Sequence, residues 1–193
     1  MKKYEEFIKE KLDIQPISRE RLLNPQSISE LGKIVKIGNS YWTATNLSTT
    51  MCADGSHLRL HKDYFFGMKK SSEIGLLYTY DAAKRIVPNG WHLPTINDIR
   101  NLRMVCDDKV SDLLSVECGG SDKFGFNAKY CGIIDSTSNN TIIWDDTAFA
   151  FWVNERGRFP YQLCISNDSD FFKFREMDGM FTEYAMCVRL VKD

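Results

Sequence analysis

The sequence predicts an α+β fold, with helices in the first half of the chain and strands in the second. Segments within residues 1–32, 75–87 and 95–106 place side chains of one face three and four positions apart, which is the spacing of an amphipathic helix. After Gly119 and Gly120 the pattern changes to short apolar runs separated by Asn, Asp, Ser and Gly clusters, which is typical of strands and turns. Helices and strands that are segregated along the chain indicate an α+β class rather than repeated β-α-β units.

The composition is that of a globular protein of one domain plus a short appendage. The chain has 193 residues, of which 43% are hydrophobic and 26% charged, and this balance excludes a disordered chain. Lys and Arg number 25 against 26 Asp and Glu, so the formal net charge is −1. A nucleic-acid partner is not expected, because such proteins carry a basic excess. No stretch approaches the roughly 20 apolar residues of a membrane span.

Residues 1–32 are predicted to form a helical N-terminal appendage, and residues 33–193 the main domain. Pro16 ends the first helix of the appendage, and Ser27 to Glu30 matches a capping box for a short second one. A helix of two or three turns is marginal alone in water, so its apolar stripe must pack on its own domain, on a second copy or on a docking partner. That stripe consists of Tyr4, Phe7, Ile8 and Leu12.

In the main domain, residues 33–47 predict two strands around a Gly38-Asn39 turn. Residues 48–72 are polar and irregular, which predicts a surface loop. A helix is expected from Gly75 to Val87, where Pro88 and the following Asn-Gly break it, and a second from Thr95, whose side chain caps residues 96–106. The expected strands of the second half lie within residues 124–134, 141–146, 148–154, 161–166, 170–174 and 184–191.

The six cysteines raise the question of whether the protein acts in an oxidising or a reducing cellular compartment. Charged residues interrupt the N-terminal segment, which therefore lacks the apolar run of a signal peptide. We therefore expect a cytoplasmic or virion protein whose cysteines are free thiols buried as small hydrophobic groups. A secreted or cell-surface protein whose leader has been removed is the alternative.

A set of motifs in fixed order resembles the Fibrobacter succinogenes major paralogous domain, a family common in gut and rumen bacteria. The motifs are IGN-x-x-W-x-x-x-NL from Ile37, LY-x-x-x-AA from Leu77, GWHLP from Gly90, GF-x-A from Gly125 and VR-x-V-x-D from Val188. The resemblance implies a C-type lectin-like fold, with two main helices packed on twisted antiparallel sheets that carry long loops. Two family cysteine positions are occupied here by Val87 and Leu190. An apolar contact in place of a disulfide agrees with a reducing site of action.

Several candidate sites have a structural alternative. His92, within GWHLP, is expected to stabilise a turn. His57 and His61 are four residues apart near Asp54 and Asp63, but no Glu completes a zinc-protease motif. Cys164 and Cys187 lie on apolar strand patterns without a neighbouring base. No catalytic residue, metal or cofactor is therefore expected.

The expected ligand-binding residues lie in and beside polar loops of the C-terminal half. Rigid aromatic groups next to adaptable polar groups suit recognition of proteins or glycans. Trp144-Asp145-Asp146 resembles part of the calcium element of sugar-binding lectins, but two carboxylates, Asp145 and Asp146, are too few for calcium on their own. The candidates are Trp144, Asp145, Asp146, Trp152, Asn154, Glu155, Arg156, Arg158, Asn167, Asp168 and Asp170.

The sequence therefore predicts a non-enzymatic binding or display module that recognises a protein or glycan, within a phage or mobile-element particle or a surface assembly. Two alternatives stay open. One is an oxidoreductase resembling the formylglycine-generating enzymes, which requires an exposed cysteine or a metal cluster. The other is a purely structural subunit of a larger assembly, which would expose the N-terminal apolar stripe for docking.

Overall fold

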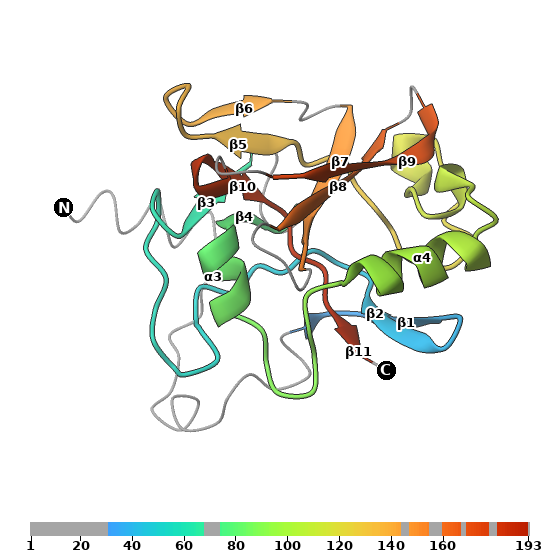
Figure 1. The fold of residues 1–193 in the computed structure, drawn as a ribbon, viewed down its shortest axis with the longest axis horizontal. Coiled ribbons are helices and arrows are strands. Elements are labelled where there is room, and N and C mark those ends of the chain that lie inside the picture. The colour runs from blue at the N-terminus through green and yellow to red at the C-terminus, as the bar shows by residue number, and fades with distance from the viewer. Residues whose placement is uncertain are drawn as a thin grey trace.

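The fold is mostly β, as a computed structural model of the chain shows (Figure 1). The structure describes residues 31–67, 74–143, 147–154, 160–166, 169–177 and 181–192. The predicted N-terminal appendage, including Tyr4, Phe7, Ile8 and Leu12, lies outside the described residues except for its last two positions. Leu31, at that boundary, is buried in the core.

Three antiparallel sheets account for the eleven strands of the described chain. The first has the order β1-β2-β11 and joins the two ends of the domain. Its strands are β1 (Ile34–Ile37), β2 (Ser40–Thr43) and β11 (Val191–Lys192). The second has the order β3-β4-β10-β5-β6. Its strands are β3 (Tyr64–Phe66), β4 (Leu76–Thr79), β5 (Ile133–Asp135), β6 (Thr141–Ile143) and β10 (Tyr184–Met186).

The third sheet, β7-β8-β9, contains the longest strands. They are β7 (Ala148–Val153), β8 (Tyr161–Ser166) and β9 (Ser169–Glu176). Every residue of β7 is buried, and its side chains alternate between two cores: Phe149, Phe151 and Val153 belong to one, Ala150 and Trp152 to the other. Because successive side chains of a strand point to opposite faces, β7 is the wall between the two cores.

The predicted α+β class with two main helices is wrong for the described chain. The only helix of more than two turns there is α4 (Ile96–Val105). The helix predicted from Gly75 to Val87 is instead the strand β4 followed by the six-residue α3 (Tyr80–Arg85). Three short 3-10 turns complete the helical content of the described ranges: η3 (Val110–Asp112), η4 (Val116–Cys118) and η5 (Phe181–Glu183).

The reason for this difference lies in residues 76–78. Leu76, Leu77 and Tyr78 have no exposed surface, because β4 lies between β3 and β10 in the middle of its sheet. A run that is apolar on both faces fits a buried strand as well as a helix, and periodicity alone does not separate the two. Gly75 enters the strand at φ +78°, and a Cβ there would lie 2.7 Å from the Leu47 carbonyl oxygen.

Two predicted elements are confirmed. The β1–β2 hairpin pairs Ile37 with Ser40 across the Gly38-Asn39 turn. Helix α4 begins at Thr95, whose hydroxyl accepts from the Asp98 amide while the Asp98 carboxylate accepts from the Thr95 amide, a reciprocal capping box. In Figure 1, α4 lies between the β1–β2 hairpin and the β7-β8-β9 sheet. Consistent with this position, the Arg103 guanidinium stacks 5.7 Å from the Phe172 ring centroid.

Candidate functional site

A pocket of about 180 Å³ lies at one end of the five-stranded sheet. The register of β3, β4, β10 and β5 places the start of β3, the end of β4, the start of β10 and the end of β5 at the same end of the sheet. The connections at that end converge around the pocket. It is lined by His61, Lys62, Phe65, Thr79, Ser136, Asn140, Thr182, Glu183 and Tyr184.

The turn after β5 is fixed to the pocket by its polar side chains. One carboxylate oxygen of Asp135 accepts from the backbone amide of Thr137 at 2.9 Å and from the Thr137 hydroxyl at 2.5 Å, so the pKa of Asp135 lies below its usual range. Ser136 donates to the Glu183 carbonyl through both its amide and its hydroxyl, each at 2.8 Å. These two hydrogen bonds to Glu183 connect the turn to η5, so two walls of the pocket are fixed to each other.

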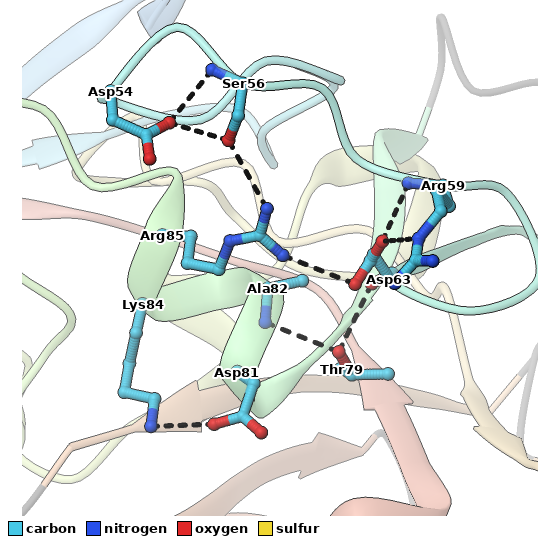
Figure 2. A network of polar contacts seen from close by, with 9 residues as sticks. All are labelled: Asp54, Ser56, Arg59, Asp63, Thr79, Asp81, Ala82, Lys84 and Arg85. Atoms are coloured by element: carbon cyan, nitrogen blue, oxygen red, sulfur yellow. Dashed lines mark hydrogen bonds and ion pairs between the residues drawn. The ribbon is translucent and has the colours of Figure 1, made fainter.

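The turn that carries His61 and Lys62 is fixed by a polar network on the opposite side (Figure 2). The Asp63 carboxylate accepts from the Arg59 backbone amide at 2.8 Å and from the Arg59 and Arg85 guanidinium groups at 3.4 Å. Arg85 extends from α3 and also donates to Ser56 at 3.4 Å. Asp63 is 8% exposed, and one carboxylate therefore links the loop before β3 to helix α3.

Removal of the Asp63 charge is expected to make the turn that forms this wall of the pocket less stable. We predict that Asp63→Asn lowers the free energy of unfolding by about 1–2 kcal/mol, because the amide retains only one acceptor and turns a donor toward Arg85. The two arginine pairs contribute the smaller part, since both guanidinium side chains are substantially exposed. Urea unfolding measures the loss, and hydrogen exchange should show faster exchange in residues 56–64.

Asp81→Asn is the matched control for Asp63→Asn. Asp81 lies on the outer side of the same network in Figure 2, where its side chain is 72% exposed and pairs only with Lys84 at 2.8 Å. Its replacement should change stability by less than about 0.5 kcal/mol. Equal losses for the two variants would show that Asp63 does not organise the turn.

The chemistry of the pocket is set by one carboxylate, one lysine and several neutral polar groups. Glu183 is half-buried, and its Oε2 is buried without a hydrogen-bond partner among the described residues. His61 and Lys62 are exposed at the rim, and Phe65 is 5% exposed. The His61 and Phe65 rings meet edge to face at 6.0 Å. The pocket thus offers donors, acceptors and aromatic surface together, which are the groups that line sites for small polar molecules.

Most of the predicted ligand residues lie outside the described residues. These are Trp144, Asp145, Asp146, Glu155, Arg156, Arg158, Asn167 and Asp168, together with the side chain of Asp170. Asn154 is exposed, and its side-chain oxygen accepts from the Tyr80 hydroxyl at 2.7 Å. Trp152 has no exposed surface, and its indole nitrogen donates to the Tyr78 carbonyl at 2.7 Å. Trp152 is therefore a core residue here, which corrects its prediction as a ligand contact.

The pocket residues were not predicted from the sequence, because they come from separate segments. Of the residues that line the pocket, the sequence drew attention only to His61, as one of the residues weighed for a metal site together with His57, Asp54 and Asp63. In the described part of the chain no three His, Cys, Asp or Glu side chains are grouped to hold a metal ion. The Asn, Ser and Thr cluster of residues 136–140 signals a turn, but nothing in it indicates which strands it will face.

The six cysteines are free in the structure, and five of them are buried. Cys187 donates weakly to the Ile74 carbonyl and accepts from the Asn46 amide at 3.1 Å. Burial raises the pKa of its thiol well above the usual value, and burial likewise raises the pKa of Cys106 to about 11. Thiols with raised pKa values are protonated at neutral pH and react slowly.

The motif residues build the fold and do not line the pocket. Arg189 is 1% exposed and donates to Asn46 Oδ1 and to the carbonyls of Thr43, Phe126 and Asn127 at 2.6–3.1 Å. The His92 ring lies 3.1 Å from the Asp98 carboxylate, and its backbone pairs with Val191. This agrees with the structural role expected for His92.

The two positions that replace family cysteines lie together in one core. Leu190 is buried in the core that contains Trp152, and Val87 packs against the same core. The core therefore encloses Leu190, whereas Val87 is partly buried at its edge. Within the described ranges, every helix is too short or too polar to span a bilayer.

Comparison with protein families gives one match. The sequence model of the Fibrobacter succinogenes major domain matches residues 35–192, a range that includes all three sheets and the pocket. No curated protein and no solved structure matches the chain. The family match covers more than half of the 193 residues, and the chain belongs to the Fibrobacter succinogenes major domain family.

Proposed function

We propose that the chain is a non-enzymatic binding module that recognises a protein or glycan ligand through the pocket at the end of the five-stranded sheet. The observation that carries this proposal is the convergence of charged, neutral polar and aromatic side chains from separate segments, the half-buried Glu183 among them, on one pocket. A few convergent polar groups beside aromatic surface are the usual lining of a ligand site.

The state of the nucleophilic groups supports binding without chemistry. Cys164 and Cys187, the thiols considered for an oxidoreductase, are 8% and 0% exposed. Neither lines the pocket. The pocket itself contains one carboxylate, Glu183, and one imidazole, His61. Polar recognition is the activity that these groups support best.

A pocket-filling variant tests the proposal. Thr182 is exposed on η5 and lines the pocket, so Thr182→Trp should fill the cavity while leaving the core intact. We expect the wild type to bind members of a panel of soluble glycans and peptides in surface plasmon resonance, and Thr182→Trp to lose at least ten-fold in affinity. Mass spectrometry of the recovered ligand should show no chemical change.

Arg175→Trp is the matched control, because Arg175 is equally exposed but lies on β9, away from the pocket. It adds the same aromatic surface and should bind as the wild type does. Chemical conversion of a bound ligand would overturn the non-enzymatic assignment. Equal binding by Thr182→Trp and the wild type would place the ligand site elsewhere.

A further inference from the structure

We propose that the pocket takes one neutral sugar residue, the end of a glycan chain, and holds it without a metal ion. This inference rests on the proposed binding function and names its ligand class. It follows from three properties of the pocket: the balance of its charges, the unpartnered oxygen of Glu183 and the aromatic side chains in its wall.

The charges in the pocket wall favour a neutral ligand. Lys62 and Glu183 are the basic and the acidic side chain of the pocket lining. A carboxylate or phosphate on the ligand would be attracted by Lys62 but repelled by Glu183. An ammonium group would be attracted by Glu183 but repelled by Lys62. A neutral ligand has no such conflict, provided that it supplies both hydrogen-bond donors and acceptors.

Vicinal hydroxyl groups supply both hydrogen-bond donors and hydrogen-bond acceptors. A hydroxyl donates one hydrogen bond and accepts others, so neighbouring hydroxyls of a sugar ring can donate to Glu183 and accept from Lys62 or Asn140. Glu183 Oε2 has no partner in the described structure. Because Glu183 lines the pocket, its carboxylate group belongs to the wall that a ligand hydroxyl would contact. A hydrogen bond to a charged acceptor is stronger than one to a neutral acceptor.

The size and the aromatic lining select a single ring. The volume of about 180 Å³ lies below the roughly 300–1,000 Å³ of pockets for drug-sized ligands. Phe65 and Tyr184 contribute aromatic surface to the wall, on which the C–H face of a sugar ring buries apolar area. The exposed side chains of Thr182, Asn140 and His61 surround the opening, where the next residue of a glycan would continue.

The experiment uses neutral monosaccharides as probes in isothermal titration calorimetry and saturation-transfer NMR. Glucose, galactose, mannose, xylose and N-acetylglucosamine are compared with glucuronate and with lysine amide as the anionic and cationic probes. We expect saturable binding of at least one neutral sugar, unchanged by EDTA and abolished by Thr182→Trp. The charged probes should bind at least ten-fold more weakly.

Glu183→Gln tests the role assigned to the carboxylate. The amide keeps the shape of the side chain but loses the charge and one acceptor, so sugar affinity should fall by about ten-fold. The same variant should keep or raise the midpoint of thermal unfolding, because it removes an unpartnered buried charge. A purely structural role for Glu183 would lower that midpoint. Glu176→Gln, at an exposed carboxylate on β9, should change neither quantity.

The outcomes separate this inference from the function on which it rests. Binding of glucuronate or lysine amide, but of no neutral sugar, with loss in Thr182→Trp, would overturn the sugar assignment and leave the binding module standing. Sugar binding that Thr182→Trp and Glu183→Gln do not weaken would overturn the assignment of the site. Absence of binding by every probe would overturn the sugar assignment, while the glycan and peptide panel decides the broader function separately.

Discussion

Arg189→Ala is expected to lower the free energy of unfolding by about 4 kcal/mol or more, a large part of the 5–15 kcal/mol that is typical of a domain. Arg189 donates to four oxygen atoms from two other segments, Thr43 and Asn46 at and just beyond the end of β2 and Phe126 with Asn127, and so joins three segments with its own. Alanine removes this donor from all four acceptors. The bonds to Thr43 and Phe126 are buried, and each buried acceptor left without a partner costs about 1–3 kcal/mol, although the losses are not additive.

The environment of Arg189 adds to the expected loss. Its guanidinium carbon lies 4.7 Å from the Phe126 ring centroid and 5.1 Å from that of Phe149, so the cation lies against both aromatic rings. Burial lowers the pKa of Arg189 from 12.5 to about 10, and the side chain therefore stays charged at neutral pH. A planar group with five donors fits four acceptors, whereas the compact ammonium of lysine does not.

Urea unfolding monitored by tryptophan fluorescence measures this effect. Arg189→Lys should recover less than half of the stability lost in Arg189→Ala, because one ammonium group cannot reach all four oxygens. Arg100→Ala, at an exposed arginine of α4, should cost less than about 0.5 kcal/mol. A small loss for Arg189→Ala would mean that water replaces the guanidinium and that the three segments do not depend on it.

Trp152→Ala is the second large effect, with an expected loss of about 3–5 kcal/mol. The Trp152 side chain has no exposed surface and packs against the Tyr80 ring, with the centroids 5.3 Å apart. Its truncation leaves a cavity between α3 and β7 and removes the indole donor from the Tyr78 carbonyl. Thermal unfolding and urea unfolding both measure the loss.

Trp152→Phe separates packing from ligand contact. Phenylalanine fills most of the volume but has no N–H donor, so stability should fall by about 1–3 kcal/mol, and the folded variant should bind ligand as the wild type does. Tyr41→Ala removes a ring that is 41% exposed and should cost less than about 1 kcal/mol. Loss of binding in a stable Trp152→Phe variant would instead support the role predicted from the sequence.

The sequence predicted local elements well where one residue type or one short signal decides them. The Gly38-Asn39 pair defines the β1–β2 hairpin, and Thr95 with Asp98 defines the start of α4. The alternating runs within residues 148–154 and 161–166 are the paired strands β7 and β8. In each case the residues whose interactions define the element are close in sequence or lie on paired strands that follow each other along the chain.

The main error arose where a segment is buried on both faces. All its side chains are then apolar, and their spacing no longer distinguishes a helix from a strand. Leu76, Leu77 and Tyr78 were assigned to a helix, yet they form the strand between β3 and β10. A strand was expected within residues 124–134, but only the last two of these residues belong to one, at the start of β5. Glycine and asparagine at positive φ, as at Gly125 and Asn127, break the extended backbone before that strand. The helix assigned to residues 76–78 is the mistake that moved the predicted class from mostly β to α+β.

The sequence by itself determined the family of the chain, its hairpin and cap signals, and the absence of long charged runs. These depend on motifs and on interactions between near neighbours, which the order of residues contains directly. Only the tertiary structure decided that Trp152 is core and that Arg189 joins three segments, because burial depends on what packs on both sides. It also formed the pocket: Lys62, Ser136 and Glu183 meet there only because β3, β5 and β10 share one sheet end.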